Sequence, residues 1–136
     1  MKNTLWTMIL TGVIAMSTTG CTQDPPAVRR FGSVIGVKDD KLAYYKELHA
    51  KPWPAVLKNI TKCNIRNYVI YLQKMDDGKH YLFSHFEYIG DDFEADMKLL
   101  AEDKETQRWW KETDPCQFPL KNETSWASMK EVFYLK

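Results

Sequence analysis

The feature that most constrains the fold of this 136-residue chain is a hairpin signal in its middle. Two strand-like runs, 67–72 (NYVIYL) and 80–89 (HYLFSHFEYI), flank Asp76-Asp77-Gly78, a typical turn sequence. Alternate positions of the second run are apolar or aromatic on both faces: Tyr81, Phe83 and His85 on one, Leu82, Phe86 and Tyr88 on the other. A sheet with one wet face would alternate apolar with charged residues. We therefore expect helices on one face and a partner sheet, a ligand or both on the other.

The segment before the hairpin predicts a strand followed by a broken helix. Residues 30–37 (RFGSVIGV) are β-branched and read as a strand. Asp39 and Asp40 are expected to cap a helix that starts near Lys41. Pro52 and Pro54 each remove a backbone donor, so this helix should break just after His49.

The segment after the hairpin predicts two helices and a final strand. Gly90-Asp91-Asp92 opens a helix that runs through Leu100, and a shorter one covers about 104–112. Residues 131–135 (EVFYL) read as the last strand. The resulting order, β-α-β-β-α-β, is the ferredoxin-like arrangement of the α+β class. Because both sheet faces should be covered, we predict a homodimer, in the form of a dimeric α/β barrel, with a pocket between sheet and helices.

The charge pattern argues against nucleic-acid partners. The formal net charge is +1, and no run of one sign occurs along the chain. Neither a nucleic acid nor an anionic membrane surface is therefore indicated as a partner. The aromatic fraction of 13% is high, and such side chains can fill a core, line a pocket or build an interface.

The first residues have the composition of a secretory leader. No charged residue lies between Lys2 and Asp24, and a short apolar run leads to Gly20-Cys21. We expect a signal peptide of the lipoprotein type over 1–20, lipidation of Cys21, a linker over 21–28 and one domain over 29–136. The protein would then be exported and anchored at the periplasm or cell surface, with the lipid as its membrane contact. Plain secretion and a spurious upstream extension are the alternatives.

Two further cysteines, Cys63 and Cys116, have no recognisable spacing. Export would permit a disulfide between them, but free buried thiols are favoured.

Tyr45 and His49 are candidate functional residues because they lie four apart, one turn from each other on a helix face. The break after His49 leaves its imidazole at a helix C-terminus, where a cation is favoured. Histidine can give and take protons near neutral pH. The alternative is a buried histidine bonded to a backbone carbonyl, and Tyr45 and Tyr68 could likewise be core residues.

Trp109 and Trp110 are adjacent and should point about 100° apart on a helix. One can pack inside while the other lines a cleft, where a flat aromatic face suits the C–H face of a sugar. An interface pair is the alternative. A metal site is not expected, because His80 and His85 should face opposite sides of a strand and no Cys–His set has ligand spacing.

Several segments resemble the L-rhamnose mutarotase family. They are 45–49 (YKELH), 51–54 (KPWP), 67–72, 107–111 (QRWWK) and 131–135, in the family's order and approximate spacing. Residues 115–128 do not obviously match, and most members begin at the first strand. The resemblance implies dimers of ferredoxin-like subunits that interconvert the α and β anomers of L-rhamnose. It further implies that His49 is the proton donor and that Tyr45, Tyr68, Trp109 and Trp110 contact the sugar.

These observations together predict an isomerase without a cofactor. It would interconvert anomers of L-rhamnose or a related deoxysugar by acid–base ring opening of the monosaccharide. A cofactor-free sugar dehydratase or lyase on the same scaffold is one alternative. A non-catalytic sugar-binding lipoprotein is the other.

Overall fold

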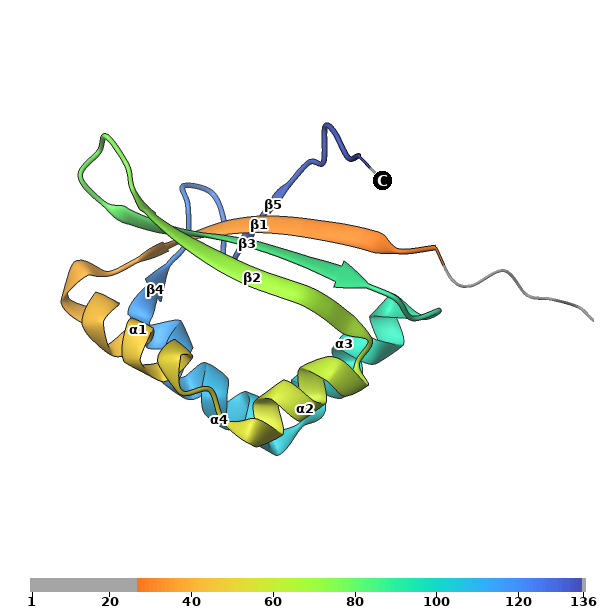
Figure 1. The fold of residues 1–136 in the computed structure, drawn as a ribbon. Helices are drawn as coiled ribbons and strands as arrows, with labels where there is room; N and C mark the ends of the chain where they lie inside the picture. Colours follow the sequence, from red (N-terminus) through yellow and green to blue (C-terminus); the bar gives the residue numbers. More distant parts are fainter. Residues whose placement is uncertain (1–26, 136) are drawn as a thin grey trace, which may run out of the picture.

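The computed structural model describes residues 27–135 (Figure 1). The predicted signal peptide over 1–20, Cys21 and most of the 21–28 linker lie outside the described residues.

The described chain forms one antiparallel sheet. Its strands are β1 (Arg29–Val37), β2 (Ile65–Lys74), β3 (His80–Tyr88), β4 (Gln117–Phe118) and β5 (Ala127–Met129). The order across the sheet is β2-β3-β1-β4, and β5 also pairs with β1. β4 pairs with the last two residues of β1 and β5 with its middle, so together they take the fourth position of the predicted ferredoxin-like sheet.

Four α-helices cover one face of this sheet (Figure 1). They are α1 (Leu42–Ala50), α2 (Pro54–Lys62), α3 (Phe93–Glu102) and α4 (Lys104–Thr113), with short 3-10 turns η1 (Asp39–Lys41) and η2 (Asp114–Cys116). Within residues 27–135, no helix combines the length and the apolar composition needed to cross a bilayer.

The helix boundaries follow from identifiable side chains. The predicted break after His49 is confirmed: α1 ends at Ala50, and Pro54 occupies the first turn of α2, where its missing N–H costs no helical bond. Asp92 caps α3 by accepting from the Ala95 amide, and Asp103 caps α4 by accepting from the Thr106 amide. The capping role predicted for Asp39 and Asp40 is wrong. Neither makes a cap bond, and Asp39 pairs with Nδ1 of His80 at 2.6 Å.

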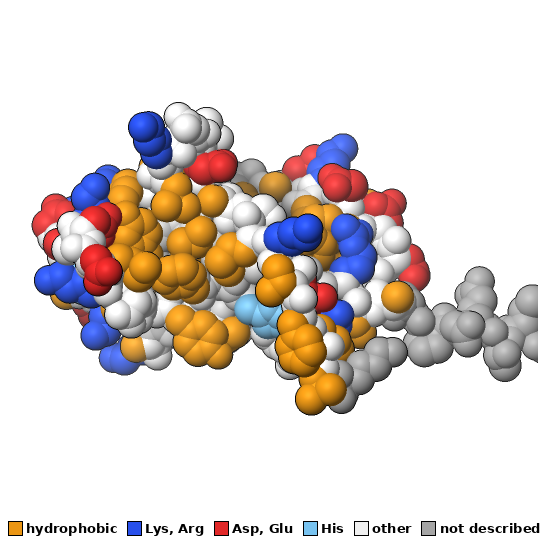
Figure 2. Space-filling model, turned by 90° about the horizontal axis from the view of Figure 1, so that it is seen from above, with side chains coloured by type: hydrophobic (Ala, Val, Ile, Leu, Met, Phe, Trp, Pro, Cys, Tyr) orange, Lys and Arg blue, Asp and Glu red, His pale blue; other side chains and the backbone are white. Residues whose placement is uncertain are grey.

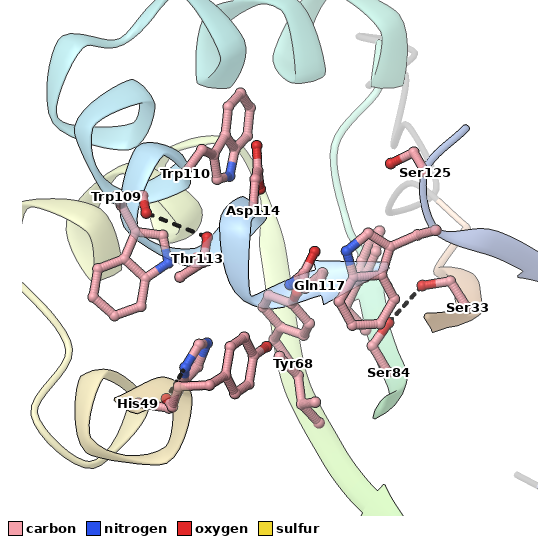
Figure 3. A pocket seen from close by; sticks show the side chains of 14 residues that line it. Ser33, His49, Tyr68, Ser84, Trp109, Trp110, Thr113, Asp114, Gln117 and Ser125 are labelled. Atoms are coloured by element: carbon pink, nitrogen blue, oxygen red, sulfur yellow. Dashed lines mark hydrogen bonds between the residues drawn. The ribbon is translucent and has the colours of Figure 1, made fainter. Parts of the chain in front are cut away.

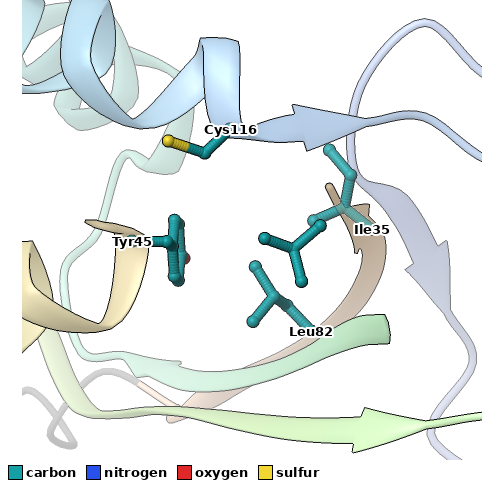
Figure 4. Close-up of a cluster of buried hydrophobic side chains, with 5 residues drawn as sticks. Ile35, Tyr45, Leu82 and Cys116 are labelled. Carbon is teal, nitrogen blue, oxygen red and sulfur yellow. The ribbon is translucent and has the colours of Figure 1, made fainter. Parts of the chain in front are cut away.

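The strand register separates two faces of the sheet. Ile35 lies opposite Leu82, and both are buried under the helices with Val37, Tyr45 and Cys116 (Figure 4). On the other face Phe83 lies opposite both Val34 and Tyr71, in one row across three strands. A second core cluster, Cys63, Ile65 and Leu100, lies toward the other end of the helices. Cys63 and Cys116 are both buried and free, as favoured from the sequence.

A β-bulge in β2 adjusts the direction of its side chains. The pairing with β3 shifts between Arg66 and Val69, so Asn67 and Tyr68 together stand opposite Phe86. Asn67 adopts a positive φ of 50°, which asparagine tolerates better than most residues. The extra residue lets Ile65 and Tyr68 both face the helices, although they are an odd number of residues apart.

The predicted final strand over 131–135 is wrong. Of the C-terminal segment, only Ala127–Met129 pairs with β1, and residues 130–135 have no strand structure. Continuing the register would bring Glu131 opposite Arg30, and the two side chains do form an ion pair there at 2.6 Å. β1 begins at Arg29, so it offers little backbone beyond that point for the tail to pair with.

Candidate active site

The predicted pocket between sheet and helices is present, with a volume of about 430 Å³ (Figure 3). Its wall combines residues from β1, β2 and β3, from helices α1 and α4, and from the segment that follows α4. The lining residues are Ser33, Tyr45, His49, Tyr68, Ile70, Ser84, Phe86, Trp109, Trp110, Thr113, Asp114, Gln117, Ser125 and Trp126. All five site residues predicted from the sequence therefore lie in one cavity.

His49 is fixed by its own helix. Its Nδ1 lies 2.9 Å from the Tyr45 carbonyl oxygen, and its ring stacks on the Tyr45 ring with centroids 4.1 Å apart. A carbonyl only accepts, so Nδ1 is the donor and Nε2 remains for the pocket. Burial lowers the pKa of His49, and the bond to the Tyr45 carbonyl raises it by less. The expectation that the helix end favours the cation is therefore wrong: desolvation has the larger effect.

Two tyrosines, Tyr45 and Tyr68, line the pocket. Tyr45 is 4% exposed, and burial raises the pKa of its hydroxyl while a hydrogen bond with the Gln117 side chain lowers it in part. Desolvation also raises the pKa of Tyr68, whose ring packs edge-on against Phe86. Both phenols are therefore neutral near pH 7 and can donate or accept hydrogen bonds.

The paired tryptophans divide their roles as their angular separation predicts. Trp109 is 8% exposed and packs between His49 and Trp53, with ring centroids 5.2 and 5.4 Å away. Trp110 is 37% exposed, and Figure 3 shows its ring near Asp114. Both line the cavity, but Trp109 also belongs to the packed interior.

Sequence reasoning missed several polar lining residues. Ser33 and Ser84 face each other across β1 and β3, and their hydroxyls are 2.7 Å apart in the pocket wall. Asp114 stands at the start of η2, immediately after α4. Ser125 and Trp126 come from the segment between β4 and β5. The sequence held one signal for Ser125 and Trp126: both lie in the segment 115–128, which departs from the family motifs.

The pocket's charge pattern suits a neutral, hydroxyl-rich ligand. No lysine or arginine lines it, and Asp114 is the one carboxylate among the lining residues. Hydroxyls, an amide, an imidazole and indole rings provide donors, acceptors and flat apolar faces. Within residues 27–135, no group of three His, Cys, Asp or Glu side chains is placed to hold a metal ion.

An apolar hollow of about 550 Å³ adjoins the pocket beneath α2, α3 and α4. The two cavities share His49, Tyr68, Ile70, Phe86, Trp109 and Trp110 in their walls. The catalytic candidates therefore stand where a polar cavity meets an apolar one.

Comparison with known proteins decides the family. The sequence profile of L-rhamnose mutarotase matches residues 30–135, almost all of the described chain. The chain belongs to the L-rhamnose mutarotase family. This confirms the resemblance found from the sequence motifs.

Several bacterial relatives show how similar this chain is to known family members. The L-rhamnose mutarotase of Bacillus subtilis (strain 168) is 30% identical over 112 residues, covering 79% of this chain and 99% of the relative. That of Lactiplantibacillus plantarum is 28% identical over 107 residues, covering 78% and 97%. Among solved structures, L-rhamnose mutarotase from Formosa agariphila matches with a TM-score of 0.61 and 21% identity, over 79% of this chain and 99% of that chain. This likeness confirms the α+β, ferredoxin-like fold class.

The family also confirms the predicted enzyme class: this is a sugar mutarotase, an isomerase.

The prediction of an exported, lipid-anchored protein is corrected by the same relatives. The match covers 99% of the Bacillus subtilis relative but 79% of this chain. That relative therefore has no counterpart of the proposed leader or of Cys21. The other relatives agree. Export was inferred from a short uncharged, apolar run, and this composition is not specific to signal peptides.

Proposed function

We propose that this mutarotase acts on L-rhamnose or a closely related deoxysugar, and that the cavity around His49 is where it does so. The observation that carries the proposal is the convergence of His49, two tyrosine hydroxyls and two indoles in one cavity, in a chain whose relatives are named L-rhamnose mutarotase. His49 would exchange a proton with the sugar through Nε2. Tyr45 and Tyr68 would bind or polarise sugar hydroxyls, and Trp109 and Trp110 would shape the pocket.

The chemistry matches what these groups can do. Mutarotation opens the ring when the ring oxygen gains a proton and the anomeric hydroxyl loses one, and closure on the other face reverses both transfers. General acid–base catalysis supplies about 10²–10⁴-fold, which is enough for a reaction that already proceeds spontaneously.

The substrate class follows from the lining of the cavity. With no lysine or arginine and one carboxylate, the wall disfavours uronic acids and sugar phosphates. Ile70 and Phe86 lie where the polar pocket meets the apolar hollow, so a methyl group at the end of the sugar would bury apolar surface there. This favours a 6-deoxysugar over its hydroxymethyl counterpart.

We further propose that the enzyme is a homodimer that pairs the helix-free faces of two sheets. Figure 2 views the molecule from above Figure 1 and shows apolar side chains gathered on this face. Tyr71, in the row with Val34 and Phe83, is 63% exposed. Exposed apolar residues of the C-terminal tail, Val132 and Phe133, are 90% and 79% exposed. An apolar patch of this kind is typical of an interface.

The test is proton NMR magnetisation transfer between the anomeric signals, with purified protein and a panel of sugars. L-Rhamnose and L-mannose form a matched pair that differs in the terminal methyl or hydroxymethyl group, and galacturonate adds a carboxylate. We expect the largest acceleration for L-rhamnose and none for galacturonate. No acceleration with any neutral aldose would contradict the proposal. New ultraviolet absorbance on turnover would point to a dehydratase or lyase, and binding without exchange to a sugar-binding protein.

A further inference from the structure

Ring opening needs two proton transfers, one to the ring oxygen and one from the anomeric hydroxyl. Nδ1 of His49 is occupied by the Tyr45 carbonyl at 2.9 Å, so this side chain has one nitrogen for the sugar. A single nitrogen can serve one of the two oxygens in a concerted step. If His49 acts as proposed above, a second group is required.

The lining of the pocket limits the choice of that group. Its titratable side chains are Tyr45, His49, Tyr68 and Asp114. Tyr45 is 4% exposed, and its hydroxyl is engaged by Gln117. Tyr68 is a neutral phenol whose pKa is raised further by desolvation, which makes it a poor acid and a poor base near neutral pH.

Asp114 differs from the other three because it is the one carboxylate among the lining residues, and a carboxylate is a far stronger base than a neutral phenol. It starts η2, whereas His49 is in the last turn of α1, so the two side chains approach the cavity from separate elements (Figure 3). Residues close to Asp114 in the chain take part in hydrogen bonds: Tyr44 donates to Glu112, and Lys38 donates to the Pro115 carbonyl.

We propose that Asp114 is the second catalytic residue. The Asp114–His49 pair carries one proton, and ring opening moves that proton from His49 to Asp114 by way of the sugar. The Asp114 carboxylate takes the proton of the anomeric hydroxyl while Nε2 of protonated His49 donates to the ring oxygen. The C1–O5 bond breaks, and the electron pair from the anomeric O–H bond forms the aldehyde. After rotation about C1–C2, Asp114 returns its proton to the aldehyde oxygen and His49 recovers the proton from the O5 hydroxyl, so no net charge or proton is gained.

The environments of the two groups favour this exchange. Burial lowers the pKa of His49, and partial desolvation raises that of Asp114, so the gap between the two ordinary values narrows. A smaller gap lowers the free-energy cost of moving the shared proton. The active form holds one proton on the pair and is most abundant between the two pKa values. The rate should therefore be bell-shaped in pH, with its maximum below the ordinary histidine pKa.

The test compares full-length wild type, Asp114→Asn, Asp114→Glu and the matched surface variant Asp91→Asn by anomer-exchange NMR on L-rhamnose across pH. Asp114→Asn should lower the catalysed rate by about 10–10²-fold at the optimum and should abolish the fall in rate on the acid side. Saturation-difference signals should show that it still binds the sugar. Asp114→Glu should recover part of the rate, and Asp91→Asn should match wild type.

The outcomes separate this role from the function itself. Full activity of Asp114→Asn beside an active wild type would overturn the role of Asp114 and leave the mutarotase proposal intact. A loss of rate with an unchanged bell-shaped profile would also overturn it, because a merely structural residue behaves in that way. An inactive wild type would overturn both.

Discussion

The two nitrogens of His49 have different surroundings in this structure, and this bears on a choice that spacing alone left open. The sequence allowed either a buried histidine bonded to a backbone carbonyl or an acid–base residue. Nδ1 bonds the Tyr45 carbonyl, and the ring still lines the pocket. The backbone bond fixes the tautomer, so a histidine bonded to a backbone carbonyl is compatible with the proposed acid–base role.

Stability should depend on the protonation of His49. Its folded-state pKa is lowered, so the unfolded state binds the proton more tightly and stability falls as pH drops through the ordinary value of 6.5. Between about pH 8 and about pH 5.5, wild type should lose more free energy of unfolding than His49→Gln. Urea denaturation of both proteins at the two pH values measures this. Equal losses would contradict the inferred desolvation.

The adjacent tryptophans should separate stability from binding. Trp109→Ala removes a nearly buried ring and should cost about 3–5 kcal/mol of folding free energy. Trp110→Ala removes a ring that is 37% exposed, so it should leave the protein folded while weakening sugar binding. Thermal denaturation and NMR titration with L-rhamnose measure the two effects. Similar losses of stability in both variants would contradict the division of roles.

At the scale of elements, the fourth position of the sheet is divided between β4 and β5, and this interruption affects the candidate site. β4 pairs with Gly36 and Val37, while β5 pairs with residues 32–34 of β1. The chain between β4 and β5 leaves the sheet and supplies Ser125 and Trp126 to the cavity. A continuous edge strand could not place these side chains there, so the interruption is part of the site.

The attachment of β4 should be sensitive to one glycine. A Cβ on Gly36 would lie 2.2 Å from the Phe118 ring, so Gly36→Ala must displace that ring. We expect a loss of about 1–3 kcal/mol, measured by chemical denaturation. The same substitution in a Phe118→Ala background should cost much less. An equal cost in both backgrounds would mean that the ring is not the obstacle.

Local signals predicted most elements, and long-range pairing accounts for the failures. The hairpin and the helix break were predictable because Asp76-Asp77-Gly78, Pro52 and Pro54 act on their own backbone. Residues 131–135 have strand composition, but a strand also needs a partner, and β1 begins at Arg29. The bulge at Asn67 and the position of Asp114 in the pocket wall likewise depend on where other segments lie. A local sequence pattern does not hold that information.

For the whole molecule, the sheet divides the tasks between its faces. The helix-covered face holds both core clusters and the cavity, while the other face presents Val34, Phe83 and Tyr71 to solvent in a single subunit. Substitutions on the second face should therefore act on assembly, while those beneath the helices should act on catalysis and folding.

The proposed dimer should be sensitive to a charge in this row. Tyr71→Asp would place a carboxylate in the proposed interface, so we expect a monomer by light scattering at micromolar concentration, where wild type should be a dimer. Leu99→Asp, at a residue that is 53% exposed on α3, is the control and should remain dimeric. A wild type that is monomeric under these conditions would contradict the dimer.

The most direct test of the account is anomer exchange of L-rhamnose, measured by saturation-transfer NMR with wild type and His49→Ala side by side. The account predicts that wild type accelerates exchange and that His49→Ala, although folded, returns it to the spontaneous rate. Acceleration by His49→Ala equal to that of wild type would contradict the central claim that His49 carries the proton transfer.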